Sequence, residues 1–204
     1  MKNIDKIYYI NLEHRIDRKQ KIEELLDLLK IDNDKKVRFN AHNFPENGSL
    51  GCVKSHLDIL IDAKKNNYKN CLILEDDFRC DKPVDILNSI EYFFNLEIDY
   101  DVIMLSSNLL RYDKTNYDKI VKVNECQTSA GYIINNKFFD KLIEVFTESV
   151  VNLELDPSIK WKYALDQNWK KIQPNSNWYS FYPTIGYQEE GYSDIEQRDV
   201  NYGC

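Results

Sequence analysis

The sequence predicts an α/β fold, in which helices cover both faces of a mostly parallel central sheet. Short β-branched and aromatic segments alternate with amphipathic segments along most of the chain, and this alternation is typical of the class. The 204 residues are 43% hydrophobic and 30% charged, which is an ordinary globular composition. A chain of this length suits one core, and no linker or repeat marks a boundary. We therefore expect a single domain over residues 1–204.

The expected elements follow from local patterns. A β-branched and aromatic run predicts a strand at 6–12, and apolar residues at helical spacing predict a helix at 17–30. The elements expected after these are a strand at 37–39, a loop at 41–50, a helix carrying Val53, Leu57, Leu60 and Ile61, a strand at 71–74, a helix at 84–95, a strand at 100–105, and a strand at 131–134 that leads into a helix with Phe138, Phe139, Leu142, Ile143 and Phe146. Residues 175–204 are expected to form an irregular tail packed across the sheet.

Charge and hydropathy argue against two kinds of partner. The formal net charge of -7 does not suit nucleic acid, which is bound through basic faces. No apolar stretch approaches the roughly 20 residues of a membrane helix, and the N-terminus lacks an apolar signal segment. We therefore expect no nucleic acid, no transmembrane segment and a cytoplasmic location. The five cysteines contain no C-x-x-C pair, which predicts reduced thiols, with Cys52 and Cys71 in the core.

Three consecutive carboxylates follow the apolar run Cys71–Leu74. A strand would place Glu75 and Asp77 on the same side and Asp76 on the other, so the first two could share a divalent cation through oxygen ligands. The alternative is a solvated junction between strand and loop, with Arg79 and Lys82 as countercharges. The triplet alone leaves both interpretations open.

Polar and basic residues follow the first strand and open the second helix. Asn11 could hydrogen-bond a base or a ribose, and Arg15 and Arg18 could bind diphosphate oxygens, although any one of these charges is more often an exposed charge at a helix start. Lys54 would strengthen the attraction that a helix N-terminus exerts on anions. His56 lies in the same segment, and its position suits a core histidine more than a catalytic one.

These motifs together resemble glycosyltransferase family 25. The residues that carry the resemblance are Tyr9-Ile-Asn-Leu12 with Arg15, Asp17 and Arg18, then Gly51-Cys-Val-Lys-Ser-His-Leu57, Leu72-Ile-Leu-Glu-Asp-Asp77, Asp101-Val-Ile-Met-Leu105, Thr128-Ser-Ala-Gly-Tyr-Ile-Ile134, Asp166, Gln188 and Ser193-Asp-Ile195. The order and spacing of the motifs are more specific than any one of them. The family includes bacterial lipooligosaccharide galactosyltransferases, collagen hydroxylysine galactosyltransferases and giant-virus relatives.

The resemblance implies a GT-A-like, Rossmann-like fold and an inverting transfer of galactose or glucose from a UDP-sugar, assisted by Mn²⁺ or Mg²⁺. The ion would be held by a D-x-D-like motif at the end of a central strand. Glu75 and Asp77 occupy that position, and Asp166 or Asp194 could supply a further ligand. The acceptor would be a hydroxyl of a glycan or of a hydroxylysine-type residue. Residues 1–110 would bind the nucleotide sugar, and residues 111–204 would form the acceptor side and the tail.

The family pattern also implies roles for single residues. Asp166 is the expected catalytic base, and the aromatic residues Trp161, Tyr163 and Trp169 could stack on sugar faces or pack in the core. The residues expected to line the uridine and diphosphate side are Asn11, Arg15, Asn40, Ala41, Lys54, Ser55 and Asp76.

Two other functions fit parts of the sequence. Acids after an apolar strand also suit a Mg²⁺-dependent phosphoryl-transfer or phosphatase-like enzyme, but such enzymes use aspartates of the first strand, which here ends in Asn-Leu. The 14 tyrosines and three tryptophans would suit a non-catalytic carbohydrate-binding module, but they leave the carboxylate triplet unexplained. An exposed aromatic patch in the tail could support a homodimer.

Overall fold

The computed structural model describes residues 1–203, so the predicted reduced thiol of Cys204 lies outside the described residues. The strands are β1 (Lys6–Asn11), β2 (Lys36–Asn40), β3 (Asn70–Glu75), β4 (Phe78–Arg79), β5 (Val102–Met104), β6 (Asn108–Lys114), β7 (Ile120–Gln127), β8 (Gly131–Asn135), β9 (Trp178–Phe181), β10 (Tyr187–Gln188), β11 (Gly191–Ser193) and β12 (Arg198–Val200). The helices are α1 (Ile16–Leu28), α2 (Gly48–Lys65), α3 (Pro83–Asn95), α4 (Phe139–Leu155), α5 (Lys160–Tyr163) and α6 (Leu165–Asn168). None of these helices is long and apolar enough to cross a bilayer.

The central sheet has eight strands within the described residues, in the order β2-β1-β3-β8-β5-β9-β7-β6. Strands β2, β1, β3, β5, β9 and β6 point in one direction, whereas β8 and β7 run antiparallel to their neighbours. The sheet is therefore mostly parallel, as predicted. The β6–β7 hairpin was not predicted, because the polar residues of β6 leave it half exposed and weaken its strand pattern.

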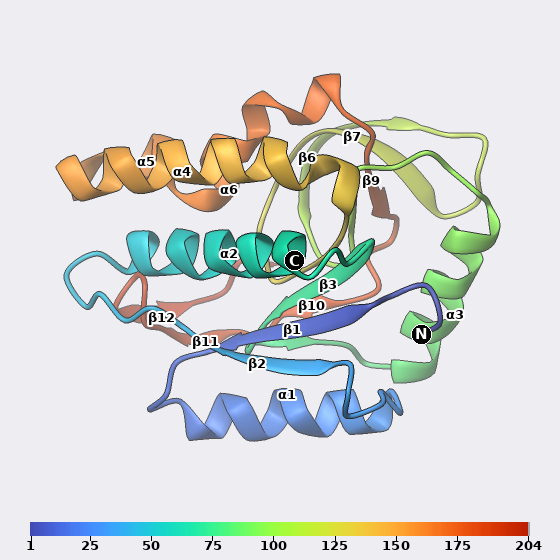
Figure 1. Cartoon of the computed structure of the whole chain (residues 1–204), viewed down its shortest axis with the longest axis horizontal. Coiled ribbons are helices and arrows are strands. Elements are labelled where there is room, and N and C mark those ends of the chain that lie inside the picture. Colours follow the sequence, from blue (N-terminus) through green and yellow to red (C-terminus); the bar gives the residue numbers. More distant parts are fainter. Residues whose placement is uncertain (204) are drawn as a thin grey trace.

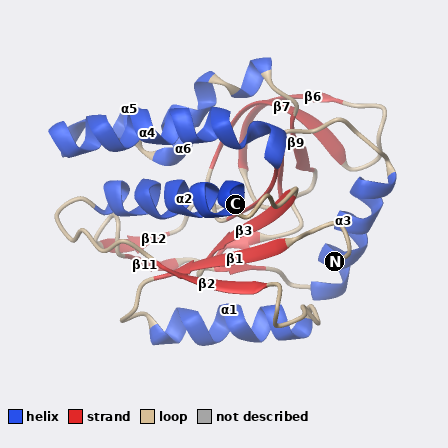
Figure 2. Cartoon of the chain, viewed as in Figure 1, coloured by secondary structure: helices blue, strands red, loops and turns tan. Residues whose placement is uncertain are grey.

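Helices cover both faces of this sheet (Figure 1). The apolar sides of α2 and α4 meet one face in a core that includes Val53, Leu60 and Phe146. Helices α1 and α3 cover the other face through a second group that includes Leu26 and Phe93. The blue helices of Figure 2 thus enclose the red sheet in a three-layer arrangement, and the predicted fold class is confirmed.

The free thiols agree with the prediction of reduced cysteines. Cys71 is fully buried in the core, whereas Cys52 is only half-buried. Cys52 packs against the core at its margin, so the expected core position is met only in part. Its partial exposure arises because α2 presents this residue at the carboxyl edge of the sheet.

The parallel strands β1, β2 and β3 end at one edge of the sheet. Asn11 is paired in register with Asn40, and Ile10 is paired with Glu75. The polar residues that follow these strands therefore gather at one edge, which is where open α/β sheets bind ligands.

The C-terminal segment differs from the irregular tail predicted for residues 175–204. Its strand β9 lies inside the sheet between β5 and β7, and its residues Trp178 and Phe181 are therefore fully buried. Beyond β9 the chain returns to the acidic edge, where β10 pairs with β4 and the Glu189 amide donates to the Asp77 carbonyl at 2.8 Å. The hairpin of β11 and β12 follows. The sequence pattern did not predict these strands because they are short and rich in polar and aromatic residues.

We predict that Gly51→Ala destabilises the fold. A Cβ at this position in α2 would lie 2.4 Å from the backbone oxygen of His42, which belongs to the loop between β2 and α2. Since backbone cannot rotate away as a side chain can, the free energy of unfolding should fall by about 1–3 kcal/mol. Urea unfolding measures the change. The exposed Lys65→Ala, in the last turn of α2, should alter it by less than about 0.5 kcal/mol. A Gly51→Ala variant as stable as the native chain would contradict this packing.

Candidate functional site

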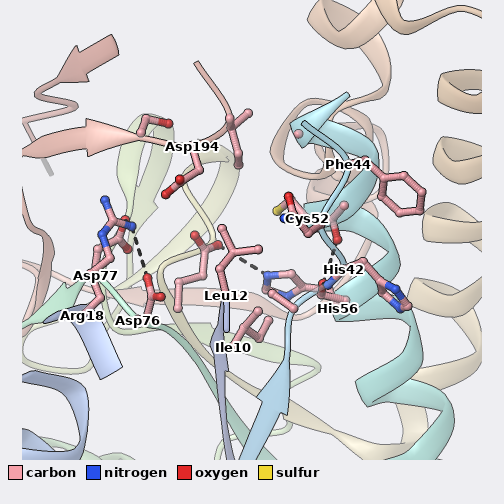
Figure 3. Close-up of a pocket in the computed structure, with 18 of the residues that line it drawn as sticks. Ile10, Leu12, Arg18, His42, Phe44, Cys52, His56, Asp76, Asp77 and Asp194 are labelled. Atoms are coloured by element: carbon pink, nitrogen blue, oxygen red, sulfur yellow. Dashed lines mark hydrogen bonds and ion pairs between the residues drawn. The ribbon is translucent and has the colours of Figure 1, made fainter. Parts of the chain in front are cut away.

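Arg18 holds two of the three carboxylates at the end of β3. Its Nη1 lies 3.1 Å from Asp76 Oδ1 and 2.9 Å from Asp77 Oδ2, and its Nη2 donates to the Tyr192 carbonyl at 2.8 Å. The guanidinium side chain is only 14% exposed, so its charge is little screened by water. Figure 3 shows Arg18 beside Asp76 and Asp77 at one side of a cavity. In the alternative of a solvated junction, Arg79 was to be a countercharge of the triplet, but it donates to backbone carbonyls and to Glu189.

Asn11 fixes the orientation of Asp76. Its amide Nδ2 donates to Asp76 Oδ2 at 2.7 Å, and its Oδ1 accepts from the Arg38 guanidinium at 2.8 Å. Both ends of the buried Asn11 amide are therefore used within the protein. Burial is the main cause that raises the pKa of Asp76, against which Asn11 and Arg18 act.

Asp77 has one oxygen without a hydrogen-bond partner among the described residues. Its Oδ2 accepts from Arg18 and from Gln188 Nε2 at 3.1 Å, but its buried Oδ1 receives no hydrogen bond. Burial, and next the negative charge of Glu75, raise the pKa of Asp77 to about 7. A buried carboxylate oxygen in this state favours a bound cation or a proton.

Glu75 faces away from Arg18, towards α2. Its Oε1 accepts from Ser129 Oγ at 2.5 Å and lies 3.4 Å from His56 Nε2. His56 is fully buried, as the core interpretation expects, and its Nδ1 lies 2.9 Å from the Tyr132 hydroxyl. Cys52 precedes His56 by one helical turn, and burial raises the pKa of its thiol well above the usual range.

A first cavity opens over the acidic edge of the sheet. Its volume, counted with the solvent at its mouth, is about 780 Å³. In Figure 3 Cys52, His56 and Phe44 lie across from the pair of Arg18 and Asp77. The lining comes from the ends of β1 and β3, the loop before α2, the first turns of α2, and the C-terminal segment. The carboxylates of the triplet therefore share a concave site with an arginine and several backbone segments.

A second cavity adjoins the first and contains Asp166. The volume of the second cavity, counted with the solvent at its mouth, is about 1180 Å³. The Asp166 Oδ2 accepts from the Thr128 amide at 3.1 Å, and burial raises the pKa of this carboxyl. The residues that line both cavities are Cys52, Glu75, Gln188, Ile195 and Tyr202. Glu75 thus lies at the wall between the two spaces.

The structure brings together only part of the predicted site. The predicted residues that line the first cavity are Ala41, Ser55, Glu75, Asp76 and Asp77, and Asp166 lines the second. The predicted residues outside both linings are Asn11, Arg15, Asn40 and Lys54.

The cations among these outer residues are paired within the protein. Lys54 Nζ lies 2.8 Å from Glu154. Arg15 Nη1 lies 2.6 Å from Asp194, the residue considered as a further metal ligand. Asp194 lines the first cavity, so Arg15 acts on this cavity through Asp194.

The aromatic residues near Asp166 separate into two groups. Trp169 is fully buried and stacks edge-on against Trp178, so it belongs to the core. Trp161 is 72% exposed and lines the second cavity. Tyr163 is partly buried and packs against the core, so of these three residues Trp161 alone has the exposure that stacking on a sugar needs.

Several lining residues were not among the predicted site residues. The loop and helix residues of this kind are His42, Phe44, Cys52 and His56, and those from the C-terminal segment are Gln188, Ser193, Ile195 and Tyr202. The Gly51-to-Leu57 motif contained a signal for Cys52 and His56. The contribution of the C-terminal segment depends on its pairing with β4, which no local pattern reveals.

Comparison with solved structures shows a shared fold. The chain superposes on a glycosyltransferase involved in the glycosylation of the major capsid of PBCV-1 with a TM-score of 0.60, at 11% identity over 94% of this chain and 95% of that one. A protein from STIV gives a TM-score of 0.53, at 13% identity over 97% of this chain and 93% of that one. The predicted GT-A-like arrangement is confirmed by the likeness to the capsid-modifying glycosyltransferase.

Sequence comparison identifies two curated relatives, although no family model matches the chain. A glycosyltransferase 25 family member of Drosophila melanogaster is 26% identical over 95% of this chain, and one of Drosophila pseudoobscura pseudoobscura is 25% identical over 79%. The chain spans 38% and 32% of the length of these proteins, respectively. Most of this chain is thus similar to two glycosyltransferase 25 family members, which confirms the resemblance that the motifs indicate.

Proposed function

We propose that this chain transfers a hexose, galactose or glucose, from a UDP-sugar to a hydroxyl of a glycan or hydroxylysine-type acceptor, with inversion at the anomeric carbon. The observation that carries the proposal is the pair of adjoining cavities. One contains Arg18 and the carboxylate triplet, the other contains Asp166 and Trp161, and Glu75 lies in the wall between them. A donor and an acceptor could therefore meet at this wall.

The first cavity suits a nucleotide diphosphate. The Arg18 guanidinium lines this cavity, and its planar set of N–H groups can donate to diphosphate oxygens. Ala41 and the loop that follows β2 offer backbone groups to a uracil ring, and Phe44 offers an aromatic face. The buried Asn11 would act on this site only by holding Asp76 in place.

A divalent cation fits the acidic edge through two carboxylates. Asp77 Oδ1 is buried and receives no hydrogen bond from residues 1–203, and hard cations such as Mn²⁺ and Mg²⁺ prefer oxygen ligands of this kind. Glu75 and Asp77 would hold the ion if the Glu75 side chain, which contacts Ser129 and His56 in the structure, turned towards Asp77. Such an ion would stabilise the negative charge of the departing diphosphate. Arg18 neutralises the remaining charge of Asp76 and Asp77 and keeps both side chains in position.

The second cavity suits the acceptor. Transfer in one displacement requires a base within hydrogen-bond reach of the attacking hydroxyl, and Asp166 is the carboxylate on this side. Its Oδ2 is held by the Thr128 amide, and Gln167 Nε2 donates to its Oδ1 at 3.3 Å. These bonds orient the carboxylate, which accepts the proton from the hydroxyl. Trp161 offers an exposed ring on which an acceptor sugar can stack.

A donor screen tests the proposal. UDP-, GDP- and CMP-sugars are incubated with the chain and with Mn²⁺ or Mg²⁺, and the released nucleotide is measured. The proposal expects hydrolysis or transfer of a UDP-hexose and little release from the other donors. Turnover of GDP- or CMP-sugars with none of any UDP-sugar would overturn the donor assignment.

We predict that Asp77→Ala abolishes transfer while the fold is kept. The substitution removes the Oδ1 that would bind the cation and one of the two carboxylates that contact Arg18, so the rate should fall by about 10²–10³-fold or more. The control is Asp118→Ala, which removes an exposed carboxylate remote from the triplet in sequence and should leave the rate unchanged. Circular dichroism checks that both variants fold. An Asp77→Ala enzyme with the native rate would show that Asp77 holds neither cation nor donor.

We predict that Asp166→Asn slows transfer but leaves UDP affinity nearly unchanged. The amide keeps the shape of the side chain but cannot accept the proton of the acceptor, so the rate should fall by about 10²–10⁴-fold. Transfer assays and calorimetry with UDP measure the two effects, and Asp140→Asn on the surface of α4 is the control. If Asp166→Asn lost UDP binding instead, the residue would belong to the donor site.

We predict an acid limb in the transfer rate that depends on Asp166. Burial raises the pKa of this carboxyl, so it takes up a proton at a higher pH than the ordinary value of about 3.9. The protonated form cannot act as a base, and the rate at saturating donor should fall about tenfold per pH unit below the raised pKa. The residual rate of Asp166→Asn should lack this limb. A pH profile of the same shape in both proteins would assign the limb to another group.

A further inference from the structure

Cys52, His56 and Glu75 form a compact group beside the triplet. Cys52 and His56 lie one turn apart on α2, and Glu75 ends β3. One ligand atom from each of the three side chains lies within 4.8 Å of the other two. Within residues 1–203, no other group of three histidine, cysteine or acidic side chains brings its ligand atoms so close together.

The second nitrogen of His56 points into this group without a hydrogen bond. The imidazole is fully buried, and its Nδ1 is bonded to the Tyr132 hydroxyl at 2.9 Å, which fixes the orientation of the ring. The ring also stacks on the Tyr132 ring, with 5.7 Å between centroids. Its Nε2 is buried and has no hydrogen-bond partner among the described residues. Its charged neighbour among these residues is Glu75 Oε1, which is an ion-pair partner only of a protonated ring. A neutral His56 therefore leaves this buried nitrogen short of a partner, which is costly.

The spacing of His56 and Glu75 suits two ligands of one ion. Nε2 and Oε1 are 3.4 Å apart, whereas a charge-assisted hydrogen bond would bring them to about 2.7–2.9 Å. A tetrahedral zinc ion with bonds of about 2.0–2.1 Å to nitrogen and oxygen separates these ligands by about 3.3 Å. The Tyr132 and Ser129 hydroxyls, bonded to His56 and Glu75, supply the outer contacts that orient metal ligands.

An ion can reach this group from solvent. Cys52 is half-buried, and Cys52 and Glu75 line both cavities. A fourth coordination position would therefore face the open space. Binding would displace the proton of the Cys52 thiol to solvent, since the thiolate is the form that ligates metal.

We infer that Cys52, His56 and Glu75 form a binding site for a borderline-soft divalent cation of the Zn²⁺ class. This site differs in chemistry from the proposed Mn²⁺ or Mg²⁺ position, because thiolate and imidazole ligands favour zinc over hard cations. The two positions share Glu75. The occupied site ties α2 to the end of β3 at the wall between the two cavities.

Anaerobic titration of the purified chain with Co²⁺, a spectroscopic substitute for Zn²⁺, tests the inference. We expect a thiolate-to-cobalt charge-transfer band that saturates at one equivalent and disappears when Zn²⁺ is added. Cys52→Ser should lose the band, and His56→Gln should weaken Co²⁺ binding by more than about tenfold. Cys80→Ser removes a thiol that packs against the core on the opposite face of the sheet from Cys52, and this variant should keep the native spectrum.

The absence of a charge-transfer band in the native chain would overturn the inference, even if the variants fail to fold. A band that persists in Cys52→Ser, or that is lost in Cys80→Ser, would do the same. UDP binding is measured on the same samples by calorimetry. A chain that binds UDP but takes up no Co²⁺ would refute this metal site and leave the proposed function standing.

Discussion

The burial of three consecutive carboxylates at the end of β3 is the constraint on which the site depends. Their mutual repulsion and lost hydration would cost several kcal/mol without partners. Arg18 reaches Asp76 and Asp77 from α1, and Gln188 reaches Asp77 from β10. One oxygen of Asp77 has no hydrogen-bond partner in the part of the chain that the structure describes, and burial raises the pKa of its carboxyl to about 7. The fold therefore neutralises the triplet only in part and leaves an atom with which a cation could interact.

The same constraint explains why distant parts of the chain meet at this edge. Parallel strands bring Asn11 and Glu75 to one edge, and Asn11 sets the side chain of Asp76. The C-terminal segment returns after β9, pairs with β4 directly behind the triplet, and closes the first cavity. Arg18 also donates to the carbonyl of Tyr192 and so connects α1, the triplet and this segment. A substitution at Arg18 would accordingly remove the positive charge beside Asp76 and Asp77 and also the contact that holds the C-terminal segment over the first cavity.

The sequence was sufficient for the parts of the fold that repeat a local pattern. The apolar run before Glu75 and the helical spacing in α1 and α2 predicted the layers and the acidic edge. Strand β9 was missed because its place is set by pairing with distant strands, and not by its own four residues. The site followed the same division. Position alone could identify the triplet, but it could not show that Lys54 is paired with Glu154 or that Arg18, and not Arg79, holds the aspartates.

Calorimetric titration with UDP, with and without Mn²⁺, tests the central claim most directly. If the first cavity is built for a nucleotide diphosphate beside an incompletely neutralised acidic edge, UDP should bind at one site per chain. Mn²⁺ should raise its affinity. A chain that gives no heat with UDP under either condition would contradict the account. It would show that Arg18 and a cation at the triplet do not bind a diphosphate. Equal affinity in the presence and absence of Mn²⁺ would contradict the metal position at Glu75 and Asp77.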